Sequence, residues 1–259
     1  MNENKGFLIG RTVEVLLSLL SPRKDECMLC KQASHLQSEE YGLCHACFKQ
    51  IPWIREVMCS NCGRGEYCSD CIRRERTYFS KNRSAVRYDD AMKELLARYK
   101  YRGDERLKSV VGHMMVHAFG LLHSEAGRKD RKKTTSDTFE LITFVPVSER
   151  RLLERGFNQA EQMATELGRR VGIPVMPLLV RSRHTDKQSF KKRSERLDDL
   201  QHAFEVSASQ VERVKCTSGS TFIIYVVDDV YTTGSTMNQC AKVLKESFAA
   251  EVFGVTWAR

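Results

Sequence analysis

The chain has 259 residues, of which 41% are hydrophobic and 29% are charged. This composition indicates a globular protein with room for one α/β domain and a small additional module. No segment reaches the roughly 20 consecutive apolar residues of a membrane span, which excludes a membrane-spanning protein. The formal net charge of +9 fits either a solvated surface or a polyanionic partner such as nucleic acid.

Residues 1–24 contain one short apolar run, Val13–Leu20, which is interrupted by Glu14. No small-x-small cleavage site follows this run before the first cysteines, so we expect a short amphipathic helix and not a signal peptide. A chain without a signal peptide is expected to be cytoplasmic, where thiols stay reduced.

Eight of the ten cysteines form four Cys-x-x-Cys pairs: Cys27/Cys30, Cys44/Cys47, Cys59/Cys62 and Cys68/Cys71. Zinc takes four thiolates in a closed tetrahedron, so eight cysteines predict two structural zinc sites with no position left for catalysis. Disulfides, redox pairs and chance are the alternatives. A reducing compartment disfavours disulfides, and four pairs in one short stretch disfavour the other two. Sequential and interleaved ligand pairing both stay open.

The cysteine segment is too small to hold a hydrophobic core, so zinc should supply its folding energy. We therefore predict two domains, with the N-terminal helix and a double zinc ribbon in residues 1–75 and an α/β domain in residues 76–259. Arginines lie near the last cysteines, so the ribbon is either a nucleic-acid or protein contact or a purely structural cap. They are Arg64, Arg73, Arg74 and Arg76.

Strands and helices alternate along residues 76–259. Apolar stripes of helical period begin at Met92, Leu107, Ala160 and Met237. Runs apolar on both faces predict buried strands at Leu141–Val147, Ile173–Val180, Phe222–Val227 and Val252–Thr256. This alternation predicts an α/β fold with a parallel sheet flanked by helices.

Two charged stretches interrupt this pattern. Residues Gly127–Asp137 predict an exposed basic insertion. Residues Arg181–Leu200 predict a mobile loop that leads into a hairpin strand near His202–Val206.

The most informative segment is Phe222–Thr236, a buried strand that ends in Asp228 and Asp229 and runs through a Thr/Gly/Ser loop into a helix. Backbone amides and hydroxyls at a helix start bind phosphate. Gly234 would let the backbone approach a ligand closely. The two acids can accept hydrogen bonds from ribose hydroxyls, and they favour a ligand loaded with Mg²⁺. The expected phosphate-binding residues are Thr232, Thr233, Gly234, Ser235 and Thr236.

Three other kinds of segment share features with Phe222–Thr236. A Walker B strand also ends in acids, but the chain has no Walker A motif. Response-regulator strands end in acids too, but they lack a phosphate loop of this kind. An ordinary capped strand-to-helix turn does not account for the combination of paired acids and the T-T-G-S-T sequence.

The same segment matches the phosphoribosyl-pyrophosphate (PRPP) motif of type I phosphoribosyltransferases. Over nearly its whole length the chain resembles the ComF family of competence proteins, and its ComFC-like members in particular. The residues that carry this resemblance, besides the cysteines, are Tyr99–Asp104, Val145–Arg151, Arg155–Gln159 and Thr185–Gln188.

The resemblance implies a type I phosphoribosyltransferase fold with PRPP and Mg²⁺ at the C-terminal edge of the sheet. It implies catalytic roles for Asp228 and Asp229, and a pyrophosphate loop at Ser148, Glu149 and Arg150. It places a flexible catalytic loop at His184–Leu200, where Lys187 would contact PRPP. Lys100 and Arg102 are either ligands or favourable helix-terminal charges, and Asn158 is expected to be a helix N-cap.

The family name implies a role in DNA uptake during natural transformation, with single-stranded DNA and a competence helicase or ATPase as partners. Two alternatives stay open. One is a Mg²⁺-dependent phosphoribosyltransferase, and the other is a non-catalytic sensor of PRPP or a nucleotide. No nucleobase-binding signature follows Val252–Thr256, so the sequence leaves the acceptor undetermined.

Overall fold

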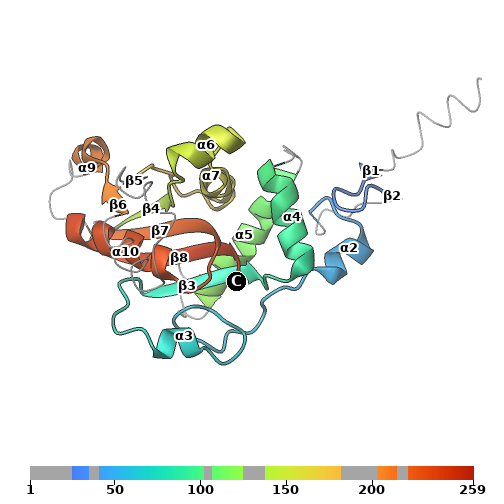
Figure 1. Cartoon of the computed structure of the whole chain (residues 1–259), viewed down its shortest axis with the longest axis horizontal. Helices are drawn as coiled ribbons and strands as arrows, with labels where there is room; N and C mark the ends of the chain where they lie inside the picture. Colours follow the sequence, from blue (N-terminus) through green and yellow to red (C-terminus); the bar gives the residue numbers. More distant parts are fainter. Residues whose placement is uncertain (1–24, 35–40, 102–106, 125–137, 182–202, 215–220) are drawn as a thin grey trace, which may run out of the picture. The chain divides into compact units, whose positions relative to one another are not determined.

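A computed structural model describes residues 25–34, 41–101, 107–124, 138–181, 203–214 and 221–259 (Figure 1). The expected N-terminal helix, the basic insertion, Arg102 and the loop carrying Lys187 lie outside these residues. Contacts divide the chain into two compact units, Met1–Gln50 and Ile51–Arg259. The domain boundary expected after residue 75, which would separate two independently folding parts, stays a prediction. Among the described helices, none combines the length and apolarity that a membrane span requires.

The first unit contains very little regular structure. Strands β1 (Asp25–Glu26) and β2 (Ala33–Ser34) pair antiparallel, and helix α2 (His45–Gln50) follows. Its buried apolar side chains among the described residues are Cys27 and Leu43. So small a core agrees with a unit that depends on metal for its stability.

The second unit is built on a parallel sheet of four strands in the order β3-β8-β7-β4. The strands are β3 (Lys81–Val86), β4 (Thr138–Phe144), β7 (Thr221–Val230) and β8 (Ala250–Ala258). The interior of β7, Phe222–Val227, is buried on both faces. This explains why it forms an uninterrupted apolar run and does not alternate.

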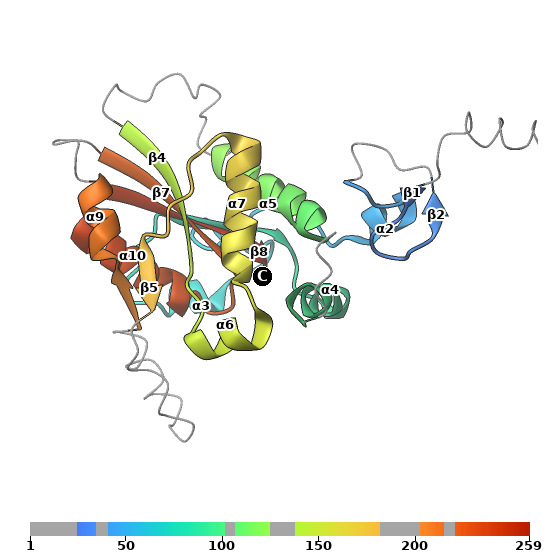
Figure 2. The same ribbon diagram turned by 90° about the horizontal axis from the view of Figure 1, so that it is seen from above.

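Helices cover both faces of this sheet. Helices α5 (Leu107–Ser124) and α7 (Gln159–Val171) pack together on one face (Figure 2), and α10 (Ser235–Ser247) packs on the other. The remaining elements are α3 (Ser69–Ile72), α4 (Asp90–Tyr101), α6 (Glu149–Arg155), β5 (Leu179–Arg181), β6 (Phe204–Val206) and α9 (Ala208–Val214). The predicted fold class, a parallel sheet flanked by helices after an N-terminal zinc-binding module, is confirmed.

Strand β3 is absent from the sequence-based prediction because four of its six residues are polar or charged. Asn82, Arg83 and Ser84 are fully buried. The Asn82 side chain donates to Thr256 Oγ1 at 3.2 Å and to the Cys62 carbonyl at 3.3 Å, while Ser84 Oγ lies 2.6 Å from Thr256 Oγ1. These hydrogen bonds satisfy the Asn82 side-chain amide donor and the Ser84 hydroxyl, whereas Asn82 Oδ1 is buried without a partner among the described residues. A hydropathy pattern cannot predict such a strand, because its stability comes from polar contacts.

The strand predicted over Ile173–Val180 is largely wrong. Only Leu179–Arg181 forms a strand, and it pairs antiparallel with β6, outside the main sheet. Val175 makes a single parallel bridge to Ile142. Pro174 and Pro177 have no N–H to donate to a ladder, so this apolar run cannot pair as a regular strand. The hairpin strand expected near His202–Val206 is confirmed as Phe204–Val206.

Candidate functional site

The C-terminal ends of the four parallel strands meet at one edge of the sheet, where open α/β sheets bind ligands. The turns there follow β3 at Arg87–Asp89, β4 at Val145–Ser148 and β7 at Tyr231–Gly234, and β8 ends at Ala258. The sheet order therefore brings the predicted acids, the Thr/Gly/Ser loop and the predicted pyrophosphate loop to the same edge.

The β7–α10 loop has the geometry of an anion site. Gly234 is the residue before the helix, with a left-handed φ of 78°. Because glycine has no side chain, Gly234 itself cannot cap the first amides of α10, although the Ser235 amide donates to Thr233 Oγ1 at 3.4 Å. The Oγ atoms of Thr233 and Ser235 lie 2.9 Å apart at the loop mouth.

The two acids at the end of β7 have different environments. The Asp228 carboxylate accepts from the Asp229 amide at 2.8 Å and lines a small cavity of about 20 Å³ together with Thr232 and Ser235. The Asp229 carboxylate accepts from the Val230 amide at 2.6 Å and forms an ion pair with Lys100. One acid therefore faces the phosphate loop while a cation of α4 holds the other.

The surroundings of Asp228 at this edge of the sheet shift its pKa. Burial raises the pKa of Asp228 to about 8, with the Asp229 carboxylate as the second cause, while Lys100 and Arg151 act in the opposite direction. Lys100 pairs with Asp229, so Asp228 is the carboxyl for which burial and a neighbouring carboxylate make ionisation costly. The raised pKa marks this edge as a place that favours a cationic or cation-loaded ligand.

The residues predicted for pyrophosphate take partly structural positions. Ser148 is the N-cap of α6, and its hydroxyl accepts from the Arg151 amide at 3.4 Å. Glu149 is exposed, and Arg150 is paired with Glu154 on the helix surface at 2.9 Å. Asn158 caps α7 by accepting from the Ala160 amide, as predicted. Arg151 is exposed on α6, and its charge acts to lower the pKa of Asp228.

A larger pocket of about 330 Å³ opens at the same edge. The residues after β3, Arg87, Tyr88 and Asp89, line one side, and Arg64 and Glu66 line another. The Asp229 carboxylate contributes to raising the pKa of Tyr88, after burial as the larger cause. The pocket therefore lies within electrostatic range of the acid pair.

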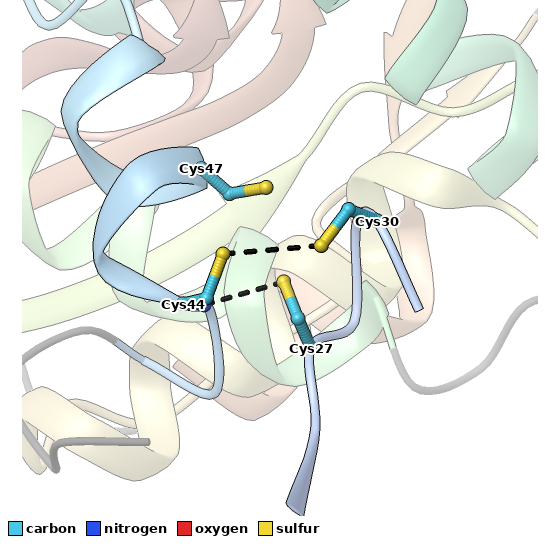
Figure 3. Close-up of side chains that lie close together, drawn as sticks. All are labelled: Cys27, Cys30, Cys44 and Cys47. Atoms are coloured by element: carbon cyan, nitrogen blue, oxygen red, sulfur yellow. Dashed lines mark hydrogen bonds between the residues drawn. The ribbon is translucent and has the colours of Figure 1, made fainter. Parts of the chain in front are cut away.

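The first cysteine cluster lies within the unit Met1–Gln50. The sulfurs of Cys27, Cys30, Cys44 and Cys47 converge (Figure 3) and all lie within 4.8 Å of one another. The Cys30 and Cys44 sulfurs are 3.8 Å apart, which matches the spacing of about 3.8 Å across a tetrahedron with Zn–S bonds of about 2.3 Å. The four thiols fit one zinc ion.

The second cluster, Cys59, Cys62, Cys68 and Cys71, has the same compactness, with 3.5 Å between the sulfurs of Cys62 and Cys68. Ligand pairing is therefore sequential, which the sequence left open. This cluster belongs to the unit of the sheet, and Cys62 and Cys68 are part of its hydrophobic core. Arg259 Nη2 lies 3.4 Å from Cys68 Sγ and adds positive charge beside the thiolates.

Two residues of the site have no signal in the sequence. Arg74 donates through Nη1 to the Tyr231 hydroxyl at 3.2 Å and through Nη2 to the Thr233 carbonyl. Tyr231 is buried behind the phosphate loop. Their positions in the chain are 157 residues apart, so only the fold brings them together.

Comparison with known proteins decides the family. Competence protein ComFC of Bacillus subtilis is 30% identical over 252 residues, which cover 90% of this chain and 94% of the relative. The chain belongs to the ComF family of competence proteins. Competence protein ComFC of Streptococcus pneumoniae is 29% identical over 96% of both chains, and the DNA utilization protein YhgH of Escherichia coli is 25% identical over 87% of this chain and 93% of the relative.

The zinc-binding part of this ComF protein also matches a family model. Residues 16–72 match the double zinc ribbon domain, in agreement with the two groups of four thiols. Among solved structures, the glutamine PRPP amidotransferase of Bacillus subtilis aligns with 67% of this chain and 31% of its own, at 16% identity and a TM-score of 0.35. The assignment to the ComF family rests on the sequence relatives and not on this distant likeness.

Proposed function

We propose that this ComF protein acts in DNA uptake and binds PRPP with Mg²⁺ at the β7–α10 loop. One observation carries the proposal: the glycine-initiated start of α10 and Asp228 line the same cavity at the C-terminal edge of the sheet. A phosphorylated sugar presents both groups that such a site recognises, a phosphate for the amides and hydroxyls for the acid.

The ligand is expected to lie across the edge of the sheet. Its 5-phosphate would accept from the amides that follow Gly234 and from the hydroxyls of Thr233 and Ser235. The ribose hydroxyls would donate to Asp228 and Asp229. The pyrophosphate would extend toward Ser148 and Arg151, and Lys187 is proposed to contact it as well.

Mg²⁺ fits the donor set because its preferred ligands are oxygens, and it is commonly bound through one or two carboxylates together with substrate phosphates. Asp228 and Asp229 would hold the ion directly or through water. The ion would neutralise charge on the pyrophosphate. This chain's own residues orient the ribose and bind the phosphate, while Lys100 keeps one of the two acids paired.

The biological part of the proposal rests on the relatives. Two are named as competence proteins and one as a DNA utilization protein. We infer a cytoplasmic factor that handles incoming DNA after its entry. The sequence has no Walker A motif. We therefore propose that a competence helicase or ATPase supplies the motor activity.

The ligand proposal is tested by thermal unfolding of the full chain with PRPP and Mg²⁺. Ligand at about 100 times its Kd adds about 2.7 kcal/mol, which shifts the melting temperature by several degrees. The Asp228→Ala, Asp229→Ala double variant should lose this shift, whereas Arg213→Gln, an exposed change on α9, should keep it. A parent protein that does not respond to PRPP would contradict the proposal.

Single-stranded DNA is the second proposed ligand, and the surface of the second ribbon favours it. Tyr67 and Ile72 are 75% and 67% exposed, and Arg73 and Arg76 are exposed beside them. Aromatic faces with nearby cations bind single strands by stacking and phosphate contacts. Affinity for an oligothymidine should fall steeply with salt. Replacing Tyr67 with Ala should weaken it, whereas replacing Phe139, an exposed aromatic of β4, with Ala should not.

An enzymatic function is the alternative that the 330 Å³ pocket favours, because this pocket, lined by the residues that follow β3 and β8, gives an acceptor room at the same edge of the sheet. In that reaction the acceptor nucleophile would form a bond to the anomeric carbon of the ribose. The bond between that carbon and the pyrophosphate oxygen would break, and pyrophosphate would leave with the electron pair. Release of pyrophosphate with a defined acceptor would establish the enzyme. PRPP binding with no turnover would indicate a sensor.

A further inference from the structure

The second cysteine cluster is integrated into the sheet unit through its packing on β3. Gly63, with a φ of 76°, lies so close to this strand that a Cβ there would be 2.6 Å from the Asn82 carbonyl. Arg83 is fully buried, and its Nη1 donates to the Ser60 carbonyl at 3.0 Å. The knuckle between Cys59 and Cys62 is therefore fixed against the sheet by backbone and side-chain contacts.

The segment that leaves this cluster runs directly behind the phosphate loop. After Cys71 the chain continues through Arg74 to Tyr78. The Arg74 guanidinium donates to the Tyr231 hydroxyl and to the Thr233 carbonyl, and its Cζ lies 5.5 Å from the ring centroid of Phe79. Hydrogen bonds from a charged donor are stronger than neutral ones, and a planar guanidinium fixes direction as well as distance.

The same segment also holds the first turns of α10. The Tyr78 amide donates to the Asn238 side chain at 2.7 Å, and the Asn238 side chain donates back to the Arg76 carbonyl at 3.0 Å. This reciprocal pair ties the backbone of residues 76–78 to the helix whose amides form the proposed anion site. Loop and helix start are thus both attached to one short segment.

A second arginine links the cluster to the loop from the other side. Arg259 Nη2 lies 3.4 Å from Cys68 Sγ, and its Cζ lies 4.5 Å from the ring centroid of Tyr231. The side chain is only 2% exposed. Tyr231 is therefore held between Arg74, which follows the cluster in sequence, and Arg259, which contacts one of its thiols.

We propose that the second zinc ribbon braces the PRPP loop, which means that it holds the loop in position. Arg74 is the positioning residue that connects the ribbon to the loop. This inference rests on the proposed PRPP site. Arg74 donates to the Thr233 carbonyl and to the buried Tyr231 hydroxyl. These two hydrogen bonds restrain the loop backbone and so fix the direction of its amides. The thiol cluster supplies a rigid anchor for the segment that carries Arg74. A site formed by loop backbone needs such support to keep its geometry within a fraction of an ångström.

The test compares Arg74→Gln with Arg213→Gln in the full chain. Arg74→Gln removes the charge and the forked donor but keeps a polar side chain with the same first carbons. We expect PRPP affinity to fall about 10–100-fold, as for the loss of a charge-assisted hydrogen bond. Zinc content should stay that of the parent, since Arg74 is not a ligand. Arg213→Gln should change neither quantity.

Hydrogen exchange without ligand separates this inference from the proposed function. In Arg74→Gln the amides of residues 232–237 should exchange faster, whereas those of β4 should exchange as in the parent. This readout applies even to a parent that fails to bind PRPP, a result that would remove the proposed function alone. The brace would be overturned if Arg74→Gln had the same amide exchange rates and the same PRPP affinity as Arg213→Gln.

Discussion

Lys100 of α4 and Asp229 of β7 form an ion pair at the edge of the sheet, and both side chains are largely buried, at 16% and 21% exposure. The pair leaves Asp228, and not Asp229, as the acid that lines the cavity of the phosphate loop. Buried charges are tolerated when they are paired, so Lys100 allows two adjacent carboxylates to exist at this position.

Replacing Lys100 with Met should weaken PRPP binding and destabilise the fold. The change leaves a second uncompensated carboxylate beside Asp228, a situation that typically costs about 3–5 kcal/mol when one partner of a buried pair is removed. Calorimetric titration and thermal unfolding would measure both effects. The matched control is Lys93→Met on the same helix, because Lys93 is exposed and its ion pair is with the exposed Asp90. Equal behaviour of the two variants would contradict the assigned role.

The raised pKa of Asp228 predicts a pH-dependent stability in Mg²⁺-free buffer. In the unfolded chain the carboxyl ionises near 3.8, whereas in the folded protein it ionises near 8. The folded state binds this proton more tightly, so its stabilisation is complete below pH 3.8 and is lost as the pH rises toward 8.

Asp228→Asn should therefore gain unfolding free energy relative to the parent as the pH rises between these two values. The measurement is denaturant unfolding of both proteins at several pH values. A constant difference between them across the whole range would show that Asp228 has an ordinary pKa.

Replacing Gly234 with Ala should abolish phosphate binding and destabilise the protein. A Cβ at this position would overlap the Tyr231 hydroxyl and lie 2.7 Å from Arg74 Nη2, and the φ of 78° is unfavourable for alanine. The steric overlap and the unfavourable φ would both displace the loop from its contact with Arg74. Gly156 is a fair control, since it also has a positive φ of 77° but its Cβ would meet nothing within 4 Å. A Gly234→Ala protein with parent affinity would refute the close packing.

Arg259→Ala should accelerate zinc release from the second cluster. The guanidinium lies beside Cys68 Sγ and is 3.8 Å from Asp70, so its removal exposes the thiolates to water and takes away a compensating charge. Changes around metal ligands typically cost about 10–100-fold in affinity. A chelator assay on the full chain should show two release phases, of which one accelerates. Acceleration of both, or of neither, would be inconsistent with the local contact.

Strands β4, β7 and β8 and the arrangement of the acids and the Thr/Gly/Ser loop were predictable because their signals are local. Phe222–Thr236 contains a buried strand, its acids and its loop in one continuous segment, so spacing alone predicts the arrangement. The cysteine pairs are equally local. The Asn158 cap followed from a polar residue standing directly before a helical stripe.

The remaining features depend on contacts distant in sequence. β3 is stabilised as a strand by the partners of Asn82 and Ser84 on β8, and neither residue is apolar. The run Ile173–Val180 has strand-like hydropathy, but its two prolines prevent regular pairing. Arg74 and Tyr231 are ordinary residues in isolation, and they belong to the site only because the second ribbon folds against the sheet unit.

The most direct test of the central claim is calorimetric titration of the zinc-loaded, full-length protein with PRPP in the presence and absence of Mg²⁺. The account predicts saturable binding of one PRPP per chain that is stronger with Mg²⁺ and is lost in the Asp228→Ala, Asp229→Ala protein. Heat of binding that persists undiminished in that variant, or no binding by a fully zinc-loaded parent, would contradict it.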